Sequence, residues 1–209
     1  MNILIAHTPK VIDASVCNAN MAAPSCVASQ APVLNKQKVT LILDLDETLI
    51  HSSFIKPDYF DFIVPVTHED QTVDIYVQKR PGFNNFIRAI AYEFDVFIFT
   101  ASMSEYAVPV IQTIIPGFPL SRILTRNHCR PYNGSLVKDI SIFRRDLSRM
   151  IIVDNSAESF ALQQENGILI STWTGDKDDA ALQEELLPFL HQCSMADDVR
   201  SVITRSYSS

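Results

Sequence analysis

Short apolar runs alternate with segments of helical periodicity from residue 39 onward. Near-continuous apolar runs at 39–43, 95–99 and 150–153, with a shorter one at 168–170, are typical of parallel strands buried on both faces. Between them, apolar residues recur at helical spacing and predict amphipathic helices at about 83–90, 107–114 and 182–190. This alternation predicts an α/β fold whose central parallel sheet is covered on both faces.

One stretch departs from that alternation. Apolar residues at 62–66 and 73–77 flank the polar residues 68–71, which predicts an antiparallel β-hairpin inserted after the first strand. Pro109 falls inside the second predicted helix, where a proline is expected to kink the backbone. We expect the third helix to break before Pro188.

The first 38 residues show neither helical nor strand periodicity. They contain few charges, many small residues and no glycine, and we expect a flexible N-terminal tail. The remaining residues, 39–209, are predicted to form one domain, with the insert at about 54–79.

Composition and charge narrow the class of protein. In 209 residues, 47% hydrophobic and 20% charged residues exclude a disordered, collagen-like or coiled-coil chain. The formal net charge of −7 argues against a protein that holds nucleic acid by its phosphates. No apolar run approaches the roughly 20 residues that span a bilayer, and the start lacks the pattern of a signal peptide. Four scattered cysteines indicate a reducing compartment, so we expect the nucleus or the cytoplasm.

Oxygen-bearing side chains follow three of the predicted strands. Asp44 and Asp46 come after the first strand, and their spacing directs both toward the same side of an extended chain. Thr100 ends the second strand, and Asp154-Asn155 follows the third. Because open parallel sheets bind ligands at the carboxyl ends of their strands, these groups are expected to meet there. A cluster of hard oxygen ligands suits Mg²⁺.

Each of these features also has a plainer explanation. Strand-end aspartates are often solvated or cap a helix, and a hydroxyl group at Thr100 or Ser102 can cap the helix that follows. Asp154-Asn155 is a common turn pair. Lys138, which could neutralise a phosphate, would by itself be read as a solvated surface charge. The combination of these groups in this order favours a phosphate site.

Taken together, the motifs resemble a known enzyme family. The order Asp-x-Asp-x-Thr, Thr, Lys and Asp resembles the haloacid dehalogenase (HAD) superfamily of Mg²⁺-dependent phosphotransferases. Over roughly residues 39–203, the chain more closely resembles the small phosphatases of the RNA polymerase II C-terminal domain, the NLI-interacting factor-like phosphatases. This closer resemblance rests on residues 43–53, 79–82, 99–102, 137–139 and 154–156. It implies a HAD-like Rossmannoid three-layer fold with a central parallel sheet and a small inserted β-hairpin cap.

The resemblance also implies roles for individual residues. Asp44 would be the nucleophile that forms an aspartyl-phosphate, and Asp46 the general acid and then the base. Thr100 and Lys138 would hold the phosphoryl oxygens, and Thr48 would position Asp46 beside the substrate. The implied Mg²⁺ ligands are the Asp44 carboxylate, the Asp46 main-chain carbonyl and the Asn155 side chain, with Asp154 bound either directly or through water.

The spacing of the motifs bears on the substrate. Only 37 residues separate Thr100 from Lys138 and 53 separate Asp46 from Thr100, which leaves no room for a large cap. An open cleft favours a phosphorylated protein or flexible peptide over an enclosed metabolite. The resemblance implies three polar substrate-binding residues, Thr48, Ser102 and Arg126. It also implies an apolar pocket for a proline-containing peptide, formed by Phe54, Val66, Ile75 and Met103. Each apolar member is as readily explained by core packing. His68 stands where the family tends to be apolar, which leaves the substrate preference open.

Three functions follow from these observations. The first is a Mg²⁺-dependent protein serine/threonine phosphatase with an aspartyl-phosphate intermediate, for which the RNA polymerase II C-terminal domain is a candidate substrate. The second is a catalytically inactive binding module or receptor on the same fold, which the intact motif set disfavours. The third is a phosphatase of small or lipid phosphate esters. The sequence does not indicate an oligomeric state.

Overall fold

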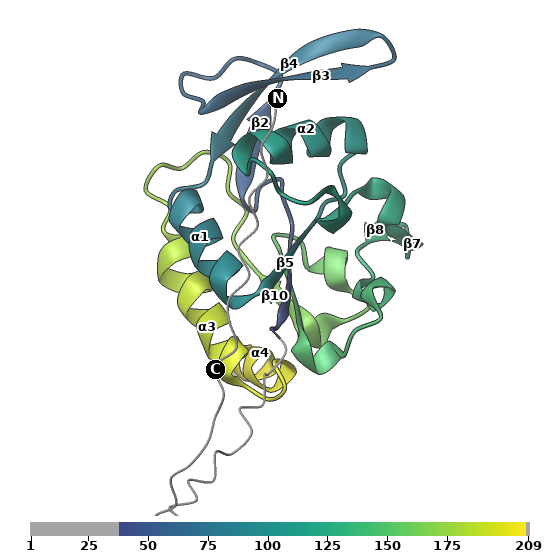
Figure 1. The fold of residues 1–209 in the computed structure, drawn as a ribbon, viewed down its shortest axis with the longest axis vertical. Coiled ribbons are helices and arrows are strands. Elements are labelled where there is room, and N and C mark those ends of the chain that lie inside the picture. The colour runs from purple at the N-terminus through teal and green to yellow at the C-terminus, as the bar shows by residue number, and fades with distance from the viewer. Residues whose placement is uncertain (1–37, 208–209) are drawn as a thin grey trace, which may run out of the picture. The chain divides into compact units, whose positions relative to one another are not determined.

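A five-stranded parallel sheet forms the centre of the computed structural model, which describes residues 38–207 (Figure 1). The strand order is β10-β9-β1-β5-β6, so the first strand of the chain lies in the middle. The strands are β1 Thr40–Leu43, β5 Asp95–Phe99, β6 Ile123–Leu124, β9 Met150–Asp154 and β10 Gly167–Leu169. The four strands predicted from apolar runs are confirmed, and the two-residue β6 is an addition.

The strand register aligns the carboxyl ends of the three central strands. Leu43 of β1 lies opposite Ile98 of β5 and Val153 of β9. The Asp44 main-chain N–H continues this ladder and donates to the Val153 carbonyl at 2.9 Å. The residues that follow the three strands therefore share one edge of the sheet.

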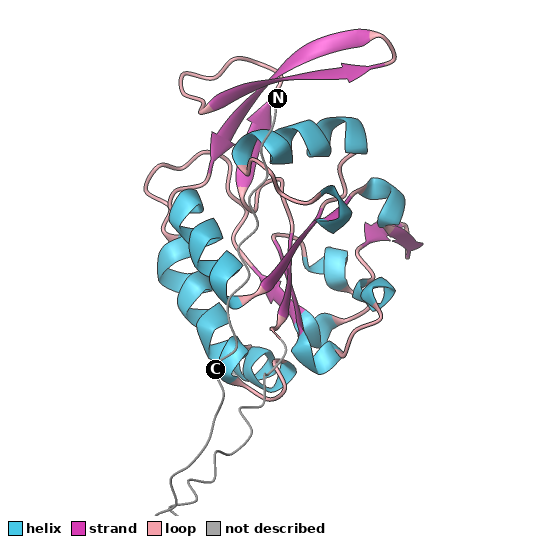
Figure 2. Ribbon diagram, viewed as in Figure 1, coloured by secondary structure: helices cyan, strands magenta, loops and turns pink. Residues whose placement is uncertain are grey.

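The two faces of the sheet are covered differently (Figure 2). Leu41 and Leu43 belong to a large core formed with helices α1 Phe83–Glu93, α2 Ser104–Ile114, α3 Leu187–Met195 and α4 Arg200–Ser206. On the other face, Ile42 belongs to a smaller core. Short 3₁₀ helices contribute to that core: Ile140–Phe143, Leu147–Arg149 and Ala157–Phe160. The predicted three-layer α/β architecture is confirmed, with 3₁₀ helices as the third layer.

The prolines affect the helices less than we expected. Helix α2 continues through Pro109 from Ser104 to Ile114. The break expected before Pro188 is wrong, because a π-helical segment, Ala181–Leu186, passes directly into α3. Pro188 lies in the first turn of α3, where a missing N–H removes no hydrogen bond of that helix.

The predicted hairpin is confirmed and is longer than the pattern indicated. Strands β3 Phe62–His68 and β4 Gln71–Lys79 pair antiparallel, and β2 Ile50–Ser53 adds a third strand beside β4. Strand β2 was not predicted, because its sequence Ile-His-Ser-Ser is mostly polar. It begins two residues after Thr48, so the hairpin is joined directly to the Asp44–Thr48 segment. A second, unpredicted hairpin, β7 Arg130–Tyr132 and β8 Ser135–Val137, leads into Lys138.

The tail predicted for residues 1–38 lies, except for Lys38, outside the described residues. Within residues 38–207, no helix has the length and apolar character needed to cross a membrane.

Arg80 connects three separate parts of the fold. Its side chain is 1% exposed, and it pairs with Asp179 through two hydrogen bonds of 2.7 Å. The same guanidinium group donates to the main-chain carbonyls of Thr48 at 3.1 Å and Ser171 at 3.0 Å. Arg80 thus holds the Asp44–Thr48 segment against the end of β4 and the segment after β10.

We expect Asp179→Ala to lower the free energy of unfolding by about 3–5 kcal/mol, because it leaves the buried Arg80 charge without its partner. Denaturant titration measures this loss, and the neighbouring exposed residue gives the matched control, Asp178→Ala, with little change. The Arg80 hydrogen bonds lower the pKa of Asp179. The contribution of the pair is therefore present above the pKa of an unfolded aspartate and is lost as the pH falls through the lower folded value. Equal stability of the two variants at neutral pH would contradict this role.

Candidate active site

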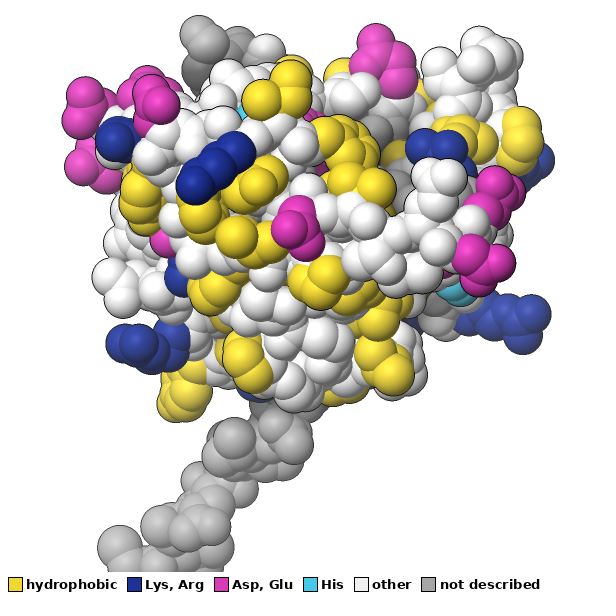
Figure 3. All heavy atoms as spheres, turned by 90° about the horizontal axis from the view of Figure 1, so that it is seen from above, with side chains coloured by type: hydrophobic (Ala, Val, Ile, Leu, Met, Phe, Trp, Pro, Cys, Tyr) yellow, Lys and Arg dark blue, Asp and Glu magenta, His cyan; other side chains and the backbone are white. Residues whose placement is uncertain are grey.

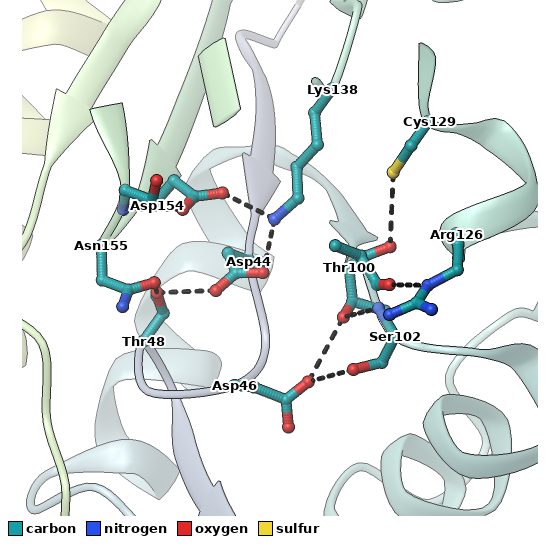
Figure 4. A network of polar contacts seen from close by, with 12 residues as sticks. Asp44, Asp46, Thr48, Thr100, Ser102, Arg126, Cys129, Lys138, Asp154 and Asn155 are labelled. Carbon is teal, nitrogen blue, oxygen red and sulfur yellow. Dashed lines mark hydrogen bonds and ion pairs between the residues drawn. The ribbon is translucent and has the colours of Figure 1, made fainter. Parts of the chain in front are cut away.

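Polar side chains from separate segments of the chain meet at the carboxyl-end edge of the sheet (Figure 4). The segment after β1, the ends of β5 and β9, and the residue after β8 each contribute to this edge. The residues that the sequence placed there and that the structure brings together are Asp44, Asp46, Thr48, Thr100, Lys138, Asp154 and Asn155.

Lys138 lies at the centre of the buried part of this site. Its Nζ donates to Oδ1 of Asp44 at 2.5 Å and to Oδ2 of Asp154 at 2.6 Å, and all three side chains are almost completely buried. Burial by itself would lower the pKa of Lys138, but the two carboxylates outweigh that effect and raise it. Lys138 is therefore a charged ammonium group held at the end of β1.

Asp154 has protein donors on both of its carboxylate oxygens. Oδ2 accepts the Lys138 hydrogen bond, and Oδ1 accepts one from the Ser156 main-chain N–H at 2.9 Å. Burial raises the pKa of Asp154 even though the Lys138 charge opposes that shift. Asp154 thus orients Lys138, and both predicted alternatives, direct ligation of a metal or contact through water, stay predictions.

Thr48 serves a different partner from the one we predicted. Its hydroxyl donates to Oδ2 of Asp44 at 2.9 Å and lies 3.4 Å from Oδ1 of Asn155. The expectation that Thr48 positions Asp46 is therefore wrong, because the tight turn after Asp46 carries the fully buried Thr48 back to Asp44. Its contact with substrate stays a prediction.

The oxygen donors fit the chemistry of a magnesium site. The Asn155 amide nitrogen donates to the Thr172 hydroxyl at 3.2 Å, so its oxygen is turned toward Thr48 and Asp44 (Figure 4). A carboxylate, an amide oxygen and the Asp46 main-chain carbonyl are ligands of the kind that Mg²⁺ takes together with water. No group of three or more His, Cys, Asp or Glu side chains has metal-binding geometry within residues 38–207, so a metal here depends on this mixed set of donors.

Asp46 lies in a separate network of hydroxyl groups. Its Oδ2 accepts hydrogen bonds from Thr100 at 3.3 Å and Ser102 at 2.7 Å, and its Oδ1 accepts one from Tyr106. Burial raises the pKa of Asp46, and the hydrogen bonds from Tyr106, Ser102 and Thr100 oppose the shift without cancelling it. A carboxyl group with a raised pKa suits proton donation to a leaving group. The predicted phosphate and substrate contacts, Thr100 and Ser102, both serve Asp46 here.

The sequence analysis missed Tyr106 and its neighbour Ser52. The Tyr106 hydroxyl is hydrogen-bonded to Ser52 Oγ at 2.7 Å as well as to Asp46. Tyr106 lies four residues after Ser102, at the start of α2, and this spacing could have indicated that the two hydroxyl groups meet. Tyr106 was not predicted because the prediction of that helix rested on its apolar periodicity alone.

The four apolar residues predicted to bind a peptide line a single pocket. Phe54, Val66, Ile75 and Met103 surround it together with Tyr106. Ile75 is 2% exposed, whereas Phe54 is 74% exposed and Met103 is 39% exposed. Figure 3 looks down on the end of the molecule that carries the hairpin, where hydrophobic side chains reach the surface. Exposure of this kind is typical of a binding surface rather than of a core.

Three further residues make local contacts near the site. The exposed Arg126 donates from Nε to the Ala101 carbonyl at 2.7 Å, beside the Thr100–Ser102 segment. His51 is hydrogen-bonded to Glu47 at 3.2 Å, and the Cys129 thiol lies 3.9 Å from the Thr100 carbonyl oxygen.

The parallel sheet, the hairpin after β1 and the strand-end carboxylates define a HAD-like α/β domain. Residues 39–200 match the model of the NLI interacting factor-like phosphatase family. The chain belongs to this family, and the resemblance found in its motifs is confirmed.

Two curated relatives illustrate the similarity. The chain is 46% identical over 167 residues to the probable C-terminal domain small phosphatase of Dictyostelium discoideum, covering 80% of this chain and 54% of that protein. It is 37% identical over 174 residues to the human carboxy-terminal domain RNA polymerase II polypeptide A small phosphatase 1, covering 83% and 66%. The chain thus spans between half and two thirds of the length of these relatives.

A solved structure shares the fold. The fission yeast RNA polymerase II CTD phosphatase Fcp1, solved as a variant with bound beryllium fluoride, matches with a TM-score of 0.54 and 21% identity. The match covers 82% of this chain and 55% of that chain.

We expect Lys138→Met to destabilise the protein by about 3–5 kcal/mol at neutral pH, because the buried carboxylates of Asp44 and Asp154 would face each other without a cation. Denaturant titration in the absence of divalent metal measures the loss, and the exposed Lys177→Met is the control. The deficit should shrink in acid, because burial raises the pKa of Asp154 and its protonation removes one of the two facing charges. A deficit as small as that of the control would show that the ammonium group is not needed between them.

Proposed function

We propose that this protein is a Mg²⁺-dependent protein serine/threonine phosphatase that works through a phosphorylated Asp44. The single observation that carries the proposal is the division of the two carboxyl groups into separate environments. Asp44 is held against the Lys138 cation, whereas Asp46 is held among neutral hydroxyl groups. One group is thereby suited to attack phosphorus and the other to carry a proton.

In the first step, an Asp44 carboxylate oxygen attacks the phosphorus of the substrate. The bond from phosphorus to the serine or threonine oxygen breaks, and Asp46 gives its proton to that leaving oxygen. In the second step, Asp46 takes a proton from a water molecule that attacks the phosphorus of the aspartyl-phosphate. Phosphate leaves, and the Asp44 carboxylate and the protonated Asp46 are restored, so protons balance over the cycle.

Other residues hold the reacting groups. The Lys138 ammonium offsets the charge on the phosphoryl oxygens, and Asp154 keeps that ammonium in place. Thr48 orients Asp44. The Thr100 hydroxyl group, which donates to Asp46 in the structure, would turn to a phosphoryl oxygen when substrate is bound. Asp44, the Asp46 carbonyl and Asn155 would hold Mg²⁺, with Asp154 in contact either directly or through water. When bound, the ion would supply positive charge between the anionic nucleophile and the anionic phosphate.

The surroundings of the site favour a peptide substrate. The apolar pocket is shared with Tyr106, whose hydroxyl contacts Asp46, so a peptide bound in it lies next to the chemistry. A proline-containing segment suits such a pocket because it is stiff before binding and loses little entropy. Arg126, which lies beside the Thr100–Ser102 segment, would contact the same peptide. A phosphorylated segment of the RNA polymerase II C-terminal domain, named in the human relative, is our candidate substrate, which would place the activity in the nucleus.

Asp44→Asn is expected to reduce kcat by about a thousandfold or more, because the amide is not a nucleophile. Phosphate release from a phosphoserine peptide with Mg²⁺ measures the loss, circular dichroism checks the fold, and the exposed Asp58→Asn is the matched control. Binding of beryllium fluoride, followed by ¹⁹F NMR, should occur in the wild type and not in Asp44→Asn. A wild-type protein that binds phosphopeptides without any turnover would favour the inactive binding module.

Phe54→Ala is expected to raise KM for a proline-containing phosphopeptide by about tenfold. A bound peptide would cover part of the exposed Phe54 ring, and full burial of such a ring contributes about 1.5–3 kcal/mol. KM for para-nitrophenyl phosphate should not change, because that ester is too small to fill the pocket. Ile55→Ala is the control, because Ile55 is 82% exposed and does not line the pocket. Better turnover of sugar phosphates or phosphatidate than of phosphopeptides would contradict a protein substrate.

A further inference from the structure

Tyr106 is shared by the polar site and the apolar pocket. Its ring lines the pocket beside Phe54, Val66 and Met103, while its hydroxyl is hydrogen-bonded to Asp46 and to Ser52. A tyrosine has one hydroxyl proton. If that proton is donated to the Asp46 carboxylate, the Ser52 hydroxyl is left to donate to the tyrosine oxygen.

The contact with Tyr106 is distinct from the other two contacts of the Asp46 carboxyl group. Thr100 and Ser102 both reach Oδ2, and both belong to the segment after β5. Tyr106 reaches Oδ1 from the first turn of α2. Hydrogen bonds to both oxygens fix the rotation of a carboxyl group, whereas bonds to one oxygen leave it free to turn. Tyr106 therefore fixes the rotation of the Asp46 carboxyl group, and with it the direction in which each carboxyl oxygen faces.

Ser52 supports Tyr106 from the hairpin side. Strand β2 carries Ser52 and pairs with β4, the strand that carries Ile75 into the pocket wall. The tyrosine is thus held between helix α2, which provides it, and the small sheet that forms the pocket. A group that fills the pocket would lie against Tyr106, whose hydroxyl is hydrogen-bonded to Asp46.

From this arrangement we infer that Tyr106 is a positioning residue through which an apolar side chain of the substrate peptide, bound in the pocket, orients the Asp46 carboxyl group for proton transfer. The inference rests on the proposed function, because it assigns Asp46 the proton transfer. In that case the pocket has two effects. A substrate residue that lies near the phosphorylated serine and fills the pocket would raise kcat as well as affinity. A substrate without that residue would bind the same site and react more slowly.

Tyr106→Phe tests the inference, since it keeps the ring in the pocket and removes the hydroxyl. We expect kcat to fall about tenfold for a phosphoserine peptide, whose alkoxide leaving group needs a proton. This is a partial loss of the roughly hundredfold or more that a positioned proton donor contributes, because Asp46 itself remains. For para-nitrophenyl phosphate, whose leaving group is stable without a proton, kcat should stay within about twofold. KM for the peptide should also change little, because the ring remains.

Coupling to the pocket requires a second comparison. In the wild type, a phosphoserine peptide with a pocket-filling proline should have a higher kcat than the same peptide in which glycine replaces that proline. The proline is placed in turn on each side of the phosphoserine. Tyr106→Phe should bring the two kcat values together. Ile55→Ala is the matched control outside the pocket, because Ile55 is 82% exposed and does not line it, and this variant should keep the wild-type difference between the two kcat values.

Several outcomes would overturn the inference. A Tyr106→Phe variant with the wild-type kcat on the phosphoserine peptide would show that the hydroxyl is dispensable. Equal losses for both leaving groups, or loss of folding seen by circular dichroism, would show a structural role. These results leave wild-type activity intact, so they are distinguishable from failure of the proposed function, in which the wild type would hydrolyse none of the substrates.

Discussion

The site depends on one buried ion cluster, the Lys138 ammonium held between the carboxylates of Asp44 and Asp154. Placing three charges out of water is costly, and it is tolerable only because both acceptors lie within hydrogen-bonding distance of one cation. The parallel register provides this geometry, since β1 and β9 end side by side and Lys138 enters from the β7–β8 hairpin. The fold therefore holds the carboxylate that we propose as the nucleophile rigidly beside a fixed positive charge.

The second carboxyl group is kept out of that cluster. Asp46 is two residues from Asp44, yet it lies among the hydroxyl groups of Thr100, Ser102 and Tyr106. The first carboxyl group lies against a cation, whereas burial among neutral hydroxyl groups raises the pKa of the second. Two carboxyl groups with different surroundings can perform two different steps, and this separation is what a two-step phosphoryl transfer requires.

Much of this arrangement could be predicted, and the part that could not has local physical causes. Buried parallel strands have near-continuous apolar sequences, and their aligned ends bring Asp44, Thr100 and Asp154 to one edge. Thr48 was assigned to the wrong carboxylate because Glu47 adopts a left-handed backbone conformation, with φ of 58°, and the tight turn that results carries Thr48 back to Asp44. Strand β2 was missed because its register depends on pairing with β4 rather than on its own polar residues. Such contacts follow from tertiary packing, which spacing along the chain does not specify.

The central claim is that Asp44 carries the phosphoryl group during turnover. Borohydride reduces an aspartyl-phosphate to homoserine, and mass spectrometry of peptides from protein quenched during hydrolysis of a phosphoserine peptide locates the modified residue. If Asp44 is phosphorylated, homoserine should appear at position 44, dependent on substrate and on Mg²⁺. Steady hydrolysis with an unmodified residue 44, or with the label on another residue, would contradict it.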